Sequence, residues 1–319
     1  MRTRHTLILL VSVLPMLLFA AGARAEATVP LGHVEVRGEG PVPMVLISGP
    51  TLDWRYWESF MERNGDAYTM YAVTLPGMSG TPAMVQPPLW RPPDRDDRNN
   101  PPLETPWLDN AVEAIADMMI EHETGRAVVM GHAMGGLLAI RMGIEHPQLV
   151  SAVISLEGPV AFPTAMKIDK VERAKDALWS FDSNMRAIPE DQWPVMMKQW
   201  TLTGVSDPEI ADLVTRLSLD TEQDVAIRYM VEHRMTDLTG EIGELRAPTL
   251  AIFTEVNAEQ VKGVNMVKKR QFGPAWHEEV RFYDTADISF FYNLKHPARF
   301  DQEIGEYLKA NNITGESAN

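Results

Sequence analysis

The sequence contains 319 residues, 45% of them hydrophobic, which suffices for one large domain with an inserted helical piece. It contains no cysteine, and this excludes disulfides, thiolate metal sites and the acylated cysteine of a bacterial lipoprotein. Its formal net charge of −15 at pH 7 argues against nucleic acid and anionic membrane surfaces as partners.

Residues 1–25 have the pattern of a secretory signal peptide. Arg2, Arg4 and His5 precede an apolar run from Leu7 to Ala21, and residues 23–25, Ala-Arg-Ala, have the small-x-small form of a cleavage site. A membrane anchor is the alternative, but the run is short for a span and Pro15 interrupts it. We therefore expect a periplasmic or secreted protein with no integral membrane span after cleavage. Its charge would be −18, because three of 29 basic residues are lost and 44 acidic ones remain.

Strand-like runs open the remaining chain. They cover His33 to Arg37 and Met44 to Ser48, with glycine and proline between them, and we expect a hairpin followed by a buried strand. A helix ending near Gly65 should follow, and then a strand from Tyr68 to Thr74.

Composition changes after this strand. Eight prolines fall between Pro82 and Pro106, mixed with charged residues, which predicts an irregular surface insertion. It is either a plain solvated loop or a segment that overhangs the mouth of a pocket. From Trp107 to Glu123 apolar residues recur at helical spacing, so an amphipathic helix is expected there.

The stretch from Ala127 to Pro147 joins a strand, a sharp turn and an apolar helix. Gly131 and Gly135 flank the apex of the turn, where larger side chains would clash because helix and strand cross closely. A further strand is expected from Val150 to Leu156. Alternation of helix and strand predicts a parallel sheet covered by helices on both faces.

The turn Gly131-His132-Ala133-Met134-Gly135 resembles the nucleophile elbow of the α/β-hydrolase family, whose pattern is G-x-S-x-G. The segment Leu75 to Thr81 resembles another turn of that family, and the resemblance covers nearly all of the chain after the signal segment. It implies an α/β-hydrolase fold with a mostly parallel sheet flanked by helices. Ala133, however, stands where the family has its serine, and a methyl group cannot carry an acyl intermediate.

The resemblance also implies a division of the chain. Residues 26–159 and 246–319 would form the core, and residues 160–245 an inserted helical cap. Methionine and aromatic residues are frequent in the cap. Such a stripe is more often plain core than ligand wall, although a cap implies an apolar pocket beneath it.

After the cap, strands are expected at Thr249 to Phe253 and Glu279 to Tyr283. One helix should continue through Arg270, and a closing helix should run from Pro297 to Lys309.

The other catalytic positions implied by the resemblance are substituted as well. Asn257 matches the acid and Asp287 matches the histidine, and an amide cannot stabilise an imidazolium as a carboxylate does. One oxyanion donor of the family corresponds to the amide of Met134. The other falls on Pro50, which has no N–H, or on Thr51 if the loop is shifted by one residue.

The remaining candidates for pocket residues are His132 beside the apex, Glu157 at a strand end and Trp54 in the loop before the first helix. Glu157 would face the same rim as Asp287, either as an acidic pair or as two exposed carboxylates. No metal and no cofactor are expected, since none of the histidines has the spacing or the clustered carboxylates of a metal site.

The sequence therefore predicts an exported α/β-hydrolase-like pseudoenzyme whose remaining pocket binds a small apolar ligand or a protein partner. One alternative is a hydrolase of small or lipid-like esters with a displaced catalytic set, for example Ser48 or Ser289 with His296 and Glu255. Another is an interaction protein whose functional surface is the proline-rich segment 82–106.

Overall fold

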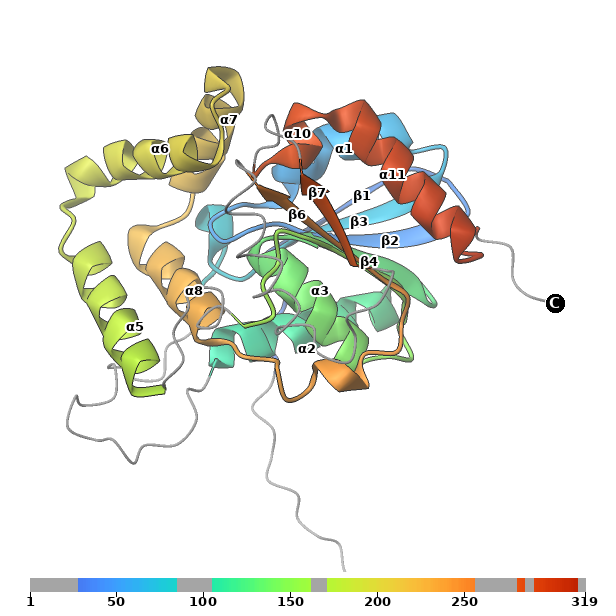
Figure 1. The fold of residues 1–319 in the computed structure, drawn as a ribbon, viewed down its shortest axis with the longest axis horizontal. Helices are drawn as coiled ribbons and strands as arrows, with labels where there is room; N and C mark the ends of the chain where they lie inside the picture. The colour runs from blue at the N-terminus through green and yellow to red at the C-terminus, as the bar shows by residue number, and fades with distance from the viewer. Residues whose placement is uncertain (1–27, 85–104, 162–170, 256–279, 285–289, 315–319) are drawn as a thin grey trace, which may run out of the picture.

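The computed structural model describes residues 28–84, 105–161, 171–255, 280–284 and 290–314, and they form a helix-covered sheet (Figure 1). Within these residues the sheet has seven strands in the order β1-β3-β2-β4-β5-β6-β7. Every neighbouring pair is parallel except β1 with β3. The strands are β1 His33–Arg37, β2 Val42–Ile47, β3 Tyr68–Thr74, β4 Ala127–His132, β5 Val150–Leu156, β6 Thr249–Glu255 and β7 Val280–Asp284.

Helices cover both faces of the sheet, with α2 and α3 on one side and α1 and α11 on the other (Figure 1). A group of four further helices, α5 to α8, projects to one side of the sheet (Figure 1). The helices are α1 Glu58–Asn64, α2 Pro106–Glu121, α3 Met134–Glu145, α5 Val171–Arg186, α6 Trp193–Gly204, α7 Pro208–Leu219, α8 Gln223–Met235, α10 Tyr292–Lys295 and α11 Pro297–Ala310. Short 3₁₀ turns are η1 Trp54–Trp57, η2 Met78–Gly80, η3 Glu190–Gln192 and η4 Ile242–Glu244.

Two separate cores result from the alternation of side chains along the strands. In β2, Val45 and Ile47 belong to the core beneath α2 and α3, whereas Met44 and Leu46 belong to the core beneath α1 and α11. Burial on both faces explains why the central strands are apolar throughout rather than alternating. The fold class predicted from the sequence, an α/β-hydrolase fold with a mostly parallel sheet, is confirmed.

The predicted hairpin between the first two strand-like runs is wrong. β1 pairs with β3 in antiparallel register, and β3 lies between β1 and β2. The connection crosses the start of β3, where Glu39 and Gly40 both donate their amides to the carbonyl of Gly65 at 2.9 and 3.2 Å. A Cβ on Gly40 would lie 2.1 Å from the carbonyl carbon of Ala67, so only glycine permits this crossing.

Helices α5 to α8 occupy the interval between β5 and β6, and we call them the helical insertion. Their own core joins Leu178 of α5, Trp193 and Met197 of α6 and the inner face of α8. Helix α8 has a second role, because its Val225 and Tyr229 belong to the core beneath α2 and α3. It therefore fastens the insertion to the sheet, together with α7, whose Val214 and Leu217 belong to the core beneath α1 and α11.

The other predicted elements fall close to the observed ones. The strands from Tyr68 to Thr74 and from Val150 to Leu156 have the predicted bounds. The closing helix ends one residue later than predicted, at Ala310. Most of the proline-rich segment and the helix expected through Arg270 lie outside the described residues. Across the described parts of the chain, every helix is too short or too polar to span a bilayer.

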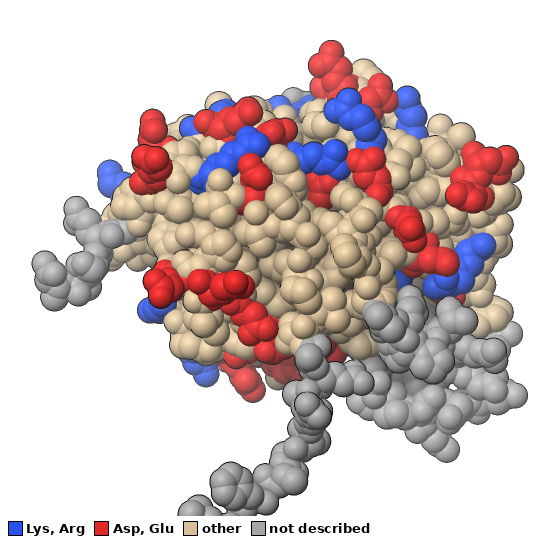
Figure 2. All heavy atoms as spheres, turned by 180° about the vertical axis from the view of Figure 1, so that it is seen from behind, with Lys and Arg blue, Asp and Glu red and all other residues tan. Residues whose placement is uncertain are grey.

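Charged side chains are interspersed on the surface opposite the view of Figure 1, with acidic groups beside basic ones around a broad uncharged area (Figure 2). Arg37 of β1 contacts the carboxylates of Glu35 at 2.9 Å and Glu58 at 3.0 Å. Exposed pairs of this kind contribute little to stability, roughly 0 to 1 kcal/mol each.

Candidate functional site

Ala133 forms the apex of the turn between β4 and α3 and is 3% exposed. Its backbone has φ 52° and ψ −113°, a conformation that residues with a Cβ rarely adopt. The structure holds it there from both sides, since its amide donates to the carbonyl of Leu156 at 2.7 Å and its carbonyl accepts from Leu137 at 3.1 Å. The sharp elbow geometry is therefore present without the serine.

Two glycines make this elbow possible. A Cβ on Gly131 would lie 2.0 Å from the carbonyl oxygen of Gly135, and a Cβ on Gly135 would lie 2.2 Å from that of Ile47. Real Cβ atoms do not approach backbone oxygens so closely, so neither position accommodates a side chain. The role assigned to these glycines from the sequence holds in the structure.

A tight turn after β2 borders the apex. The amide of Leu52 donates to the carbonyl of Gly49 at 3.2 Å, Pro50 is in second position, and Thr51 in third position has φ 72°. Proline followed by a positive φ is the pattern of a type II turn. A Cβ built on Gly49 would lie 3.5 Å from the Cβ of Ala133, so the turn packs directly on the apex.

The candidate oxyanion positions follow from this arrangement. Pro50 supplies no N–H to the apex, and Thr51 is buried with its side chain and carbonyl bonded to the helical insertion. Met134 is the first residue of α3, where backbone amides have no partner within their own helix. Pro50 is therefore excluded as an oxyanion donor, and the amide of Met134 is suited to that role.

His132 is 1% exposed and lies among aromatic rings beside the apex. Its ring stacks on Tyr56 with centroids 5.0 Å apart and meets Phe290 edge-on at 4.8 Å. The Nε2 atom lies 2.9 Å from the carbonyl oxygen of Phe290. Because a carbonyl only accepts, Nε2 carries the proton and Nδ1 is a lone-pair acceptor. Among the residues that the structure describes, none forms a hydrogen bond with Nδ1.

Burial lowers the pKa of His132 to about 4, and the bond to the Phe290 carbonyl raises it only in part. On helix α8, His233 is buried too, and burial together with the nearby Arg234 and His132 lowers its pKa to about 3. Both imidazoles are neutral at pH 7 and are weak bases. A general base of this strength is poorly matched to hydrolysis at neutral pH.

The other pocket candidates are Glu157 and Trp54. Glu157 directly follows β5, is half-buried, has φ 54°, and donates its amide to Ile252 at 2.8 Å. It is close enough to Tyr56 to influence the pKa of that phenol. Trp54 directs its ring to β1, 6.0 Å from the ring of His33 and beneath the guanidinium of Arg37 at 5.0 Å.

Residues of the displaced catalytic set are only partly described. Ser48 is buried and its hydroxyl donates to the carbonyl of Asp53 at 2.7 Å, so its proton is engaged within the loop. His296 is half-buried at the start of α11, with its ring 5.7 Å from that of Tyr292. Asn257, Asp287 and Ser289 lie outside the described residues, and so the structure places only Ala133 of the three triad-equivalent positions.

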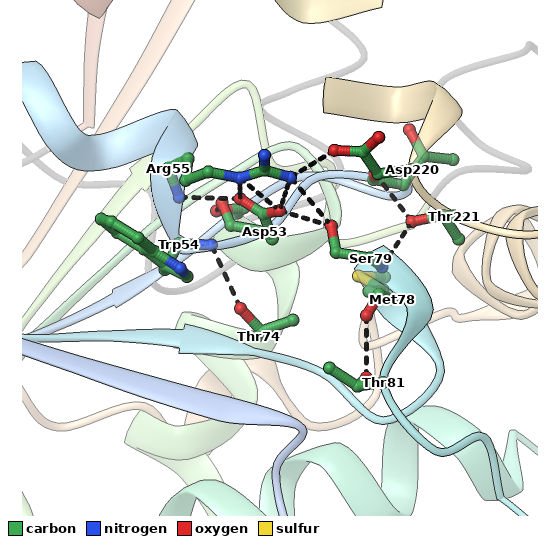
Figure 3. Close-up of polar contacts among 11 residues, drawn as sticks. Asp53, Trp54, Arg55, Thr74, Met78, Ser79, Thr81, Asp220 and Thr221 are labelled. Atoms are coloured by element: carbon green, nitrogen blue, oxygen red, sulfur yellow. Dashed lines mark hydrogen bonds and ion pairs between the residues drawn. The ribbon is translucent and has the colours of Figure 1, made fainter. Parts of the chain in front are cut away.

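A cluster that the sequence analysis did not single out lies next to the apex turn. Asp53 and Arg55 after β2 meet Ser79 after β3 and Asp220 at the end of α7 (Figure 3). These residues are far apart in sequence. The only local sign of the cluster in the sequence is that Asp53 and Arg55 stand two positions apart in a loop. Among the described residues no group of three or more metal-binding side chains occurs.

A family model described as the alpha/beta hydrolase family matches residues 44–280. The chain belongs to the α/β-hydrolase family. This match spans the elbow, the helical insertion and β6, which agrees with the geometry of the turn at Ala133.

Curated relatives of this family member include two esterases. Pimeloyl-[acyl-carrier protein] methyl ester esterase of Vibrio vulnificus (strain YJ016) is 24% identical over 130 residues, or 41% of this chain and 42% of that protein. Its namesake from Salmonella heidelberg (strain SL476) is 25% identical over 128 residues, or 39% and 40%. The chain thus spans about two fifths of the length of these curated relatives.

Solved structures resemble this α/β hydrolase more widely. MenH from S. aureus superimposes with a TM-score of 0.68 at 15% identity, covering 88% of this chain and 99% of that one. A thermophilic esterase from Thermogutta terrifontis, solved with malate bound, gives 0.64 at 16% identity, covering 88% and 93%. At such identities the likeness shows the fold.

Proposed function

We propose that this α/β hydrolase is an exported protein without serine-hydrolase activity, and that its elbow binds a small apolar ligand. The observation that carries the proposal is Ala133, which keeps the elbow conformation but offers only a methyl group to a bound carbonyl. The neighbouring His132 supports it, because its lowered pKa and its bond to Phe290 make it a poor base.

Asn257 and Asp287 support the proposal from the sequence. A single alanine at the apex would leave the rest of a triad in place, whereas here the acid and the histidine of the family pattern are replaced too. Removing one triad member leaves roughly 10³ to 10⁴ of rate over water, supplied by the oxyanion hole and binding. Pro50 weakens the hole as well.

The test is labelling and turnover. The purified wild-type protein is expected to show no reaction with a fluorophosphonate probe and no hydrolysis of p-nitrophenyl butyrate above an unrelated protein. The triple variant Ala133→Ser, Asn257→Asp, Asp287→His is expected to hydrolyse the ester at least tenfold faster than wild type. Stoichiometric labelling of the wild type would overturn the proposal.

Binding is measured separately, with p-nitrophenyl butyrate as the probe in isothermal titration calorimetry. Ala133→Leu is expected to weaken binding at least tenfold, because the larger side chain would occupy the position where the ligand contacts the elbow. Ala298→Leu, at an exposed position of α11, is the matched control and should leave binding unchanged. Equal binding by all three proteins would place the ligand elsewhere and reject the elbow as its site.

Ester hydrolysis through a displaced set is the second candidate, favoured by the esterase relatives. It requires the Ser48 or Ser289 hydroxyl as nucleophile. The bond from Ser48 to the Asp53 carbonyl opposes the first choice. Fluorophosphonate labelling that disappears in Ser48→Ala or in Ser289→Ala would establish this candidate and identify its serine.

A further inference from the structure

The end of α7 touches the turn that borders the apex. We define the α7 end as residues 218–221 and the apex turn as residues 49–52. The hydroxyl of Thr51 donates to that of Ser218 at 2.9 Å, and the hydroxyl of Thr221 donates to the carbonyl of Thr51 at 3.2 Å. All three residues are buried. Thr51 is thus held through both its side chain and its backbone by the helical insertion.

The same α7 end also holds the loop after β3. The amide of Ser79 donates to the hydroxyl of Thr221 at 3.0 Å (Figure 3), so Thr221 links two loops of the core. Ser79 has φ 50° and Thr51 has φ 72°, both in the left-handed region that favours glycine. Two residues in unfavourable backbone conformations therefore meet at the one hydroxyl of Thr221.

An ionic contact surrounds these hydrogen bonds. Arg55 binds Asp53 through Nε at 2.9 Å and Asp220 through Nη2 at 2.5 Å, and the hydroxyl of Ser79 donates to Asp53 (Figure 3). The Asp53 carboxylate is buried, whereas that of Asp220 is 45% exposed. Solvent screens the ion pair between Arg55 and the exposed Asp220, so this pair contributes little. The buried hydrogen bonds of Thr51 therefore define the contact with the α7 end more specifically.

The apex turn has an intrinsic tendency to open. Type II turns favour glycine in the third position because its φ is positive, and Thr51 is β-branched. The conformation persists only where surrounding contacts impose it. Here those contacts come from the insertion, and the first residue of the turn, Gly49, packs on Ala133 and beside Nδ1 of His132.

We propose that the α7 end is a latch that keeps the apex turn closed over Ala133. When α7 moves away from the core, Thr51 relaxes to a negative φ, and Gly49 withdraws from the methyl group of Ala133 and from Nδ1 of His132. Opening of the insertion and uncovering of the elbow are then one event. The latch rests on backbone geometry and stands whether or not the elbow binds a ligand.

Hydrogen exchange read by mass spectrometry tests the latch in the full-length protein. The double variant Ser218→Ala, Thr221→Val removes the hydroxyls that hold Thr51. We expect amides of residues 49–53 to exchange at least tenfold faster than in wild type, with residues 127–132 of β4 unchanged. Unchanged exchange at 49–53, or an equal increase in β4, would reject the latch.

Asp212→Ala is the matched control. It breaks the ion pair between Lys198 and Asp212 at 2.8 Å, which joins α6 to α7 within the insertion and does not reach the core. Exchange of residues 49–53 should stay at the wild-type rate. A tenfold increase in this variant would show that any weakening of the insertion opens the turn, and would overturn the specific role of the α7 end.

The variant Thr51→Gly separates the latch from simple loss of contacts. Glycine adopts a positive φ without penalty, so the turn no longer needs the insertion to hold it closed. In this background, the added substitutions Ser218→Ala and Thr221→Val should speed exchange of residues 49–53 less than threefold. An increase as large as the one that the same two substitutions cause in the otherwise wild-type protein would show that the positive φ of Thr51 is not the reason for opening.

Discussion

Single residues beside the elbow carry conformations that their side chains disfavour. Ala133 and Thr51 both have positive φ, at a cost of roughly 1 to 2 kcal/mol each for a residue with a Cβ. Ala133 is held by backbone bonds within the sheet and α3, whereas Thr51 is held by side chains of the insertion. The strained conformation of Ala133 is therefore imposed by the sheet and α3, whereas that of Thr51 depends on the position of α7.

Two buried neutral histidines make stability depend on pH. The folded-state pKa is about 4 for His132 and about 3 for His233, against 6.5 for an exposed histidine. A depressed pKa contributes stability that is present above pH 6.5 and is lost as pH falls toward the folded value. Each should remove about 1.4 kcal/mol per pH unit below pH 6.5.

Urea unfolding between pH 7.5 and 5.0 checks this slope. His132→Phe keeps an aromatic ring against Tyr56 and removes one of the two buried histidines, so its stability should fall less steeply on acidification than that of wild type. His122→Phe is the control, because His122 is exposed at the end of α2. Identical slopes for His132→Phe and wild type would show that His132 does not remain neutral.

Only part of this residue-scale picture was accessible to the sequence. The sequence alone shows that Ala133 replaces the family's serine and that Pro50 has no backbone N–H. The proton position on His132 depends on Phe290, 158 residues away, and the strain at Thr51 depends on Ser218, 167 residues away. Contacts over such distances have no local signal, so these features needed the fold.

At the scale of elements, a buried carboxylate joins α8 to α2. Glu232 accepts from the amides of Trp107 at 2.8 Å and Leu108 at 3.0 Å, which begin α2, and also from Arg228 at 2.5 Å. Burial raises the pKa of Glu232 to about 7, although Arg228 and the two amides lower it in part. The folded-state pKa of Glu232 is therefore raised, whereas those of the two histidines are lowered, so the two kinds of group change stability with pH in opposite directions.

The raised pKa fixes the sign of a second prediction. Stability from Glu232 is fully present below pH 4.5 and is lost as pH rises through 7, by about 1.4 kcal/mol per pH unit. Between pH 4.5 and 6.5, the stability gained from Glu232 on acidification offsets the stability lost from one of the two histidines. Glu232→Gln should accordingly make stability fall more steeply on acidification than in wild type.

The measurement is again urea unfolding over pH 5.0 to 7.5. Glu303→Gln is the matched control, since Glu303 pairs with Arg299 within α11 at 2.9 Å and joins no second long helix. A slope for Glu232→Gln equal to that of wild type would mean that Glu232 is already ionised at pH 5.

Elements with a strong local pattern were predicted well. The strand from Tyr68 to Thr74 and the elbow between β4 and α3 carry their periodicity or their glycines in a few consecutive residues. The pairing of β1 was missed, because two strand-like runs joined by glycines read as a hairpin. Its partner β3 comes later in the chain, and no local pattern distinguishes the two pairings.

Across the whole molecule, the helical insertion is fastened unevenly. Helix α8 contributes Val225 and Tyr229 to the main core, and the hydroxyl of Tyr229 donates to the carbonyl of Pro76 at 3.0 Å. Helices α5 and α6 instead pack mainly on α8 and α7, and expose Trp179, Val195 and Leu202. The outer part therefore has fewer ties to the sheet.

Hydrogen exchange in low urea should separate these parts. We expect α8 amides to open with nearly the free energy of β4, because they share one core, and α5 and α6 amides to open with at least 2 kcal/mol less. Simultaneous protection of α5, α6 and β4 at every urea concentration would show instead that the insertion and sheet unfold as a single unit.

The division into a sheet and an inserted group of helices was implied by the family resemblance, since the helices fall between β5 and β6. The ties between them were not foreseen. They include Glu232, Thr221 and Asp220. These polar residues look like ordinary surface positions until α7 and α8 are placed against α2 and the loops after β2 and β3.

Placing β3 between β1 and β2 has a consequence for a chain that leaves the ribosome from its N-terminus. The segment that becomes β1 appears first, yet it acquires its ladder only after Thr74 has been added and β3 has aligned on β2. Until then the backbone N–H and C=O groups of the β1 segment have no strand to pair with. A fragment ending before Thr74, studied free of the ribosome, should leave His33 to Arg37 open to protease.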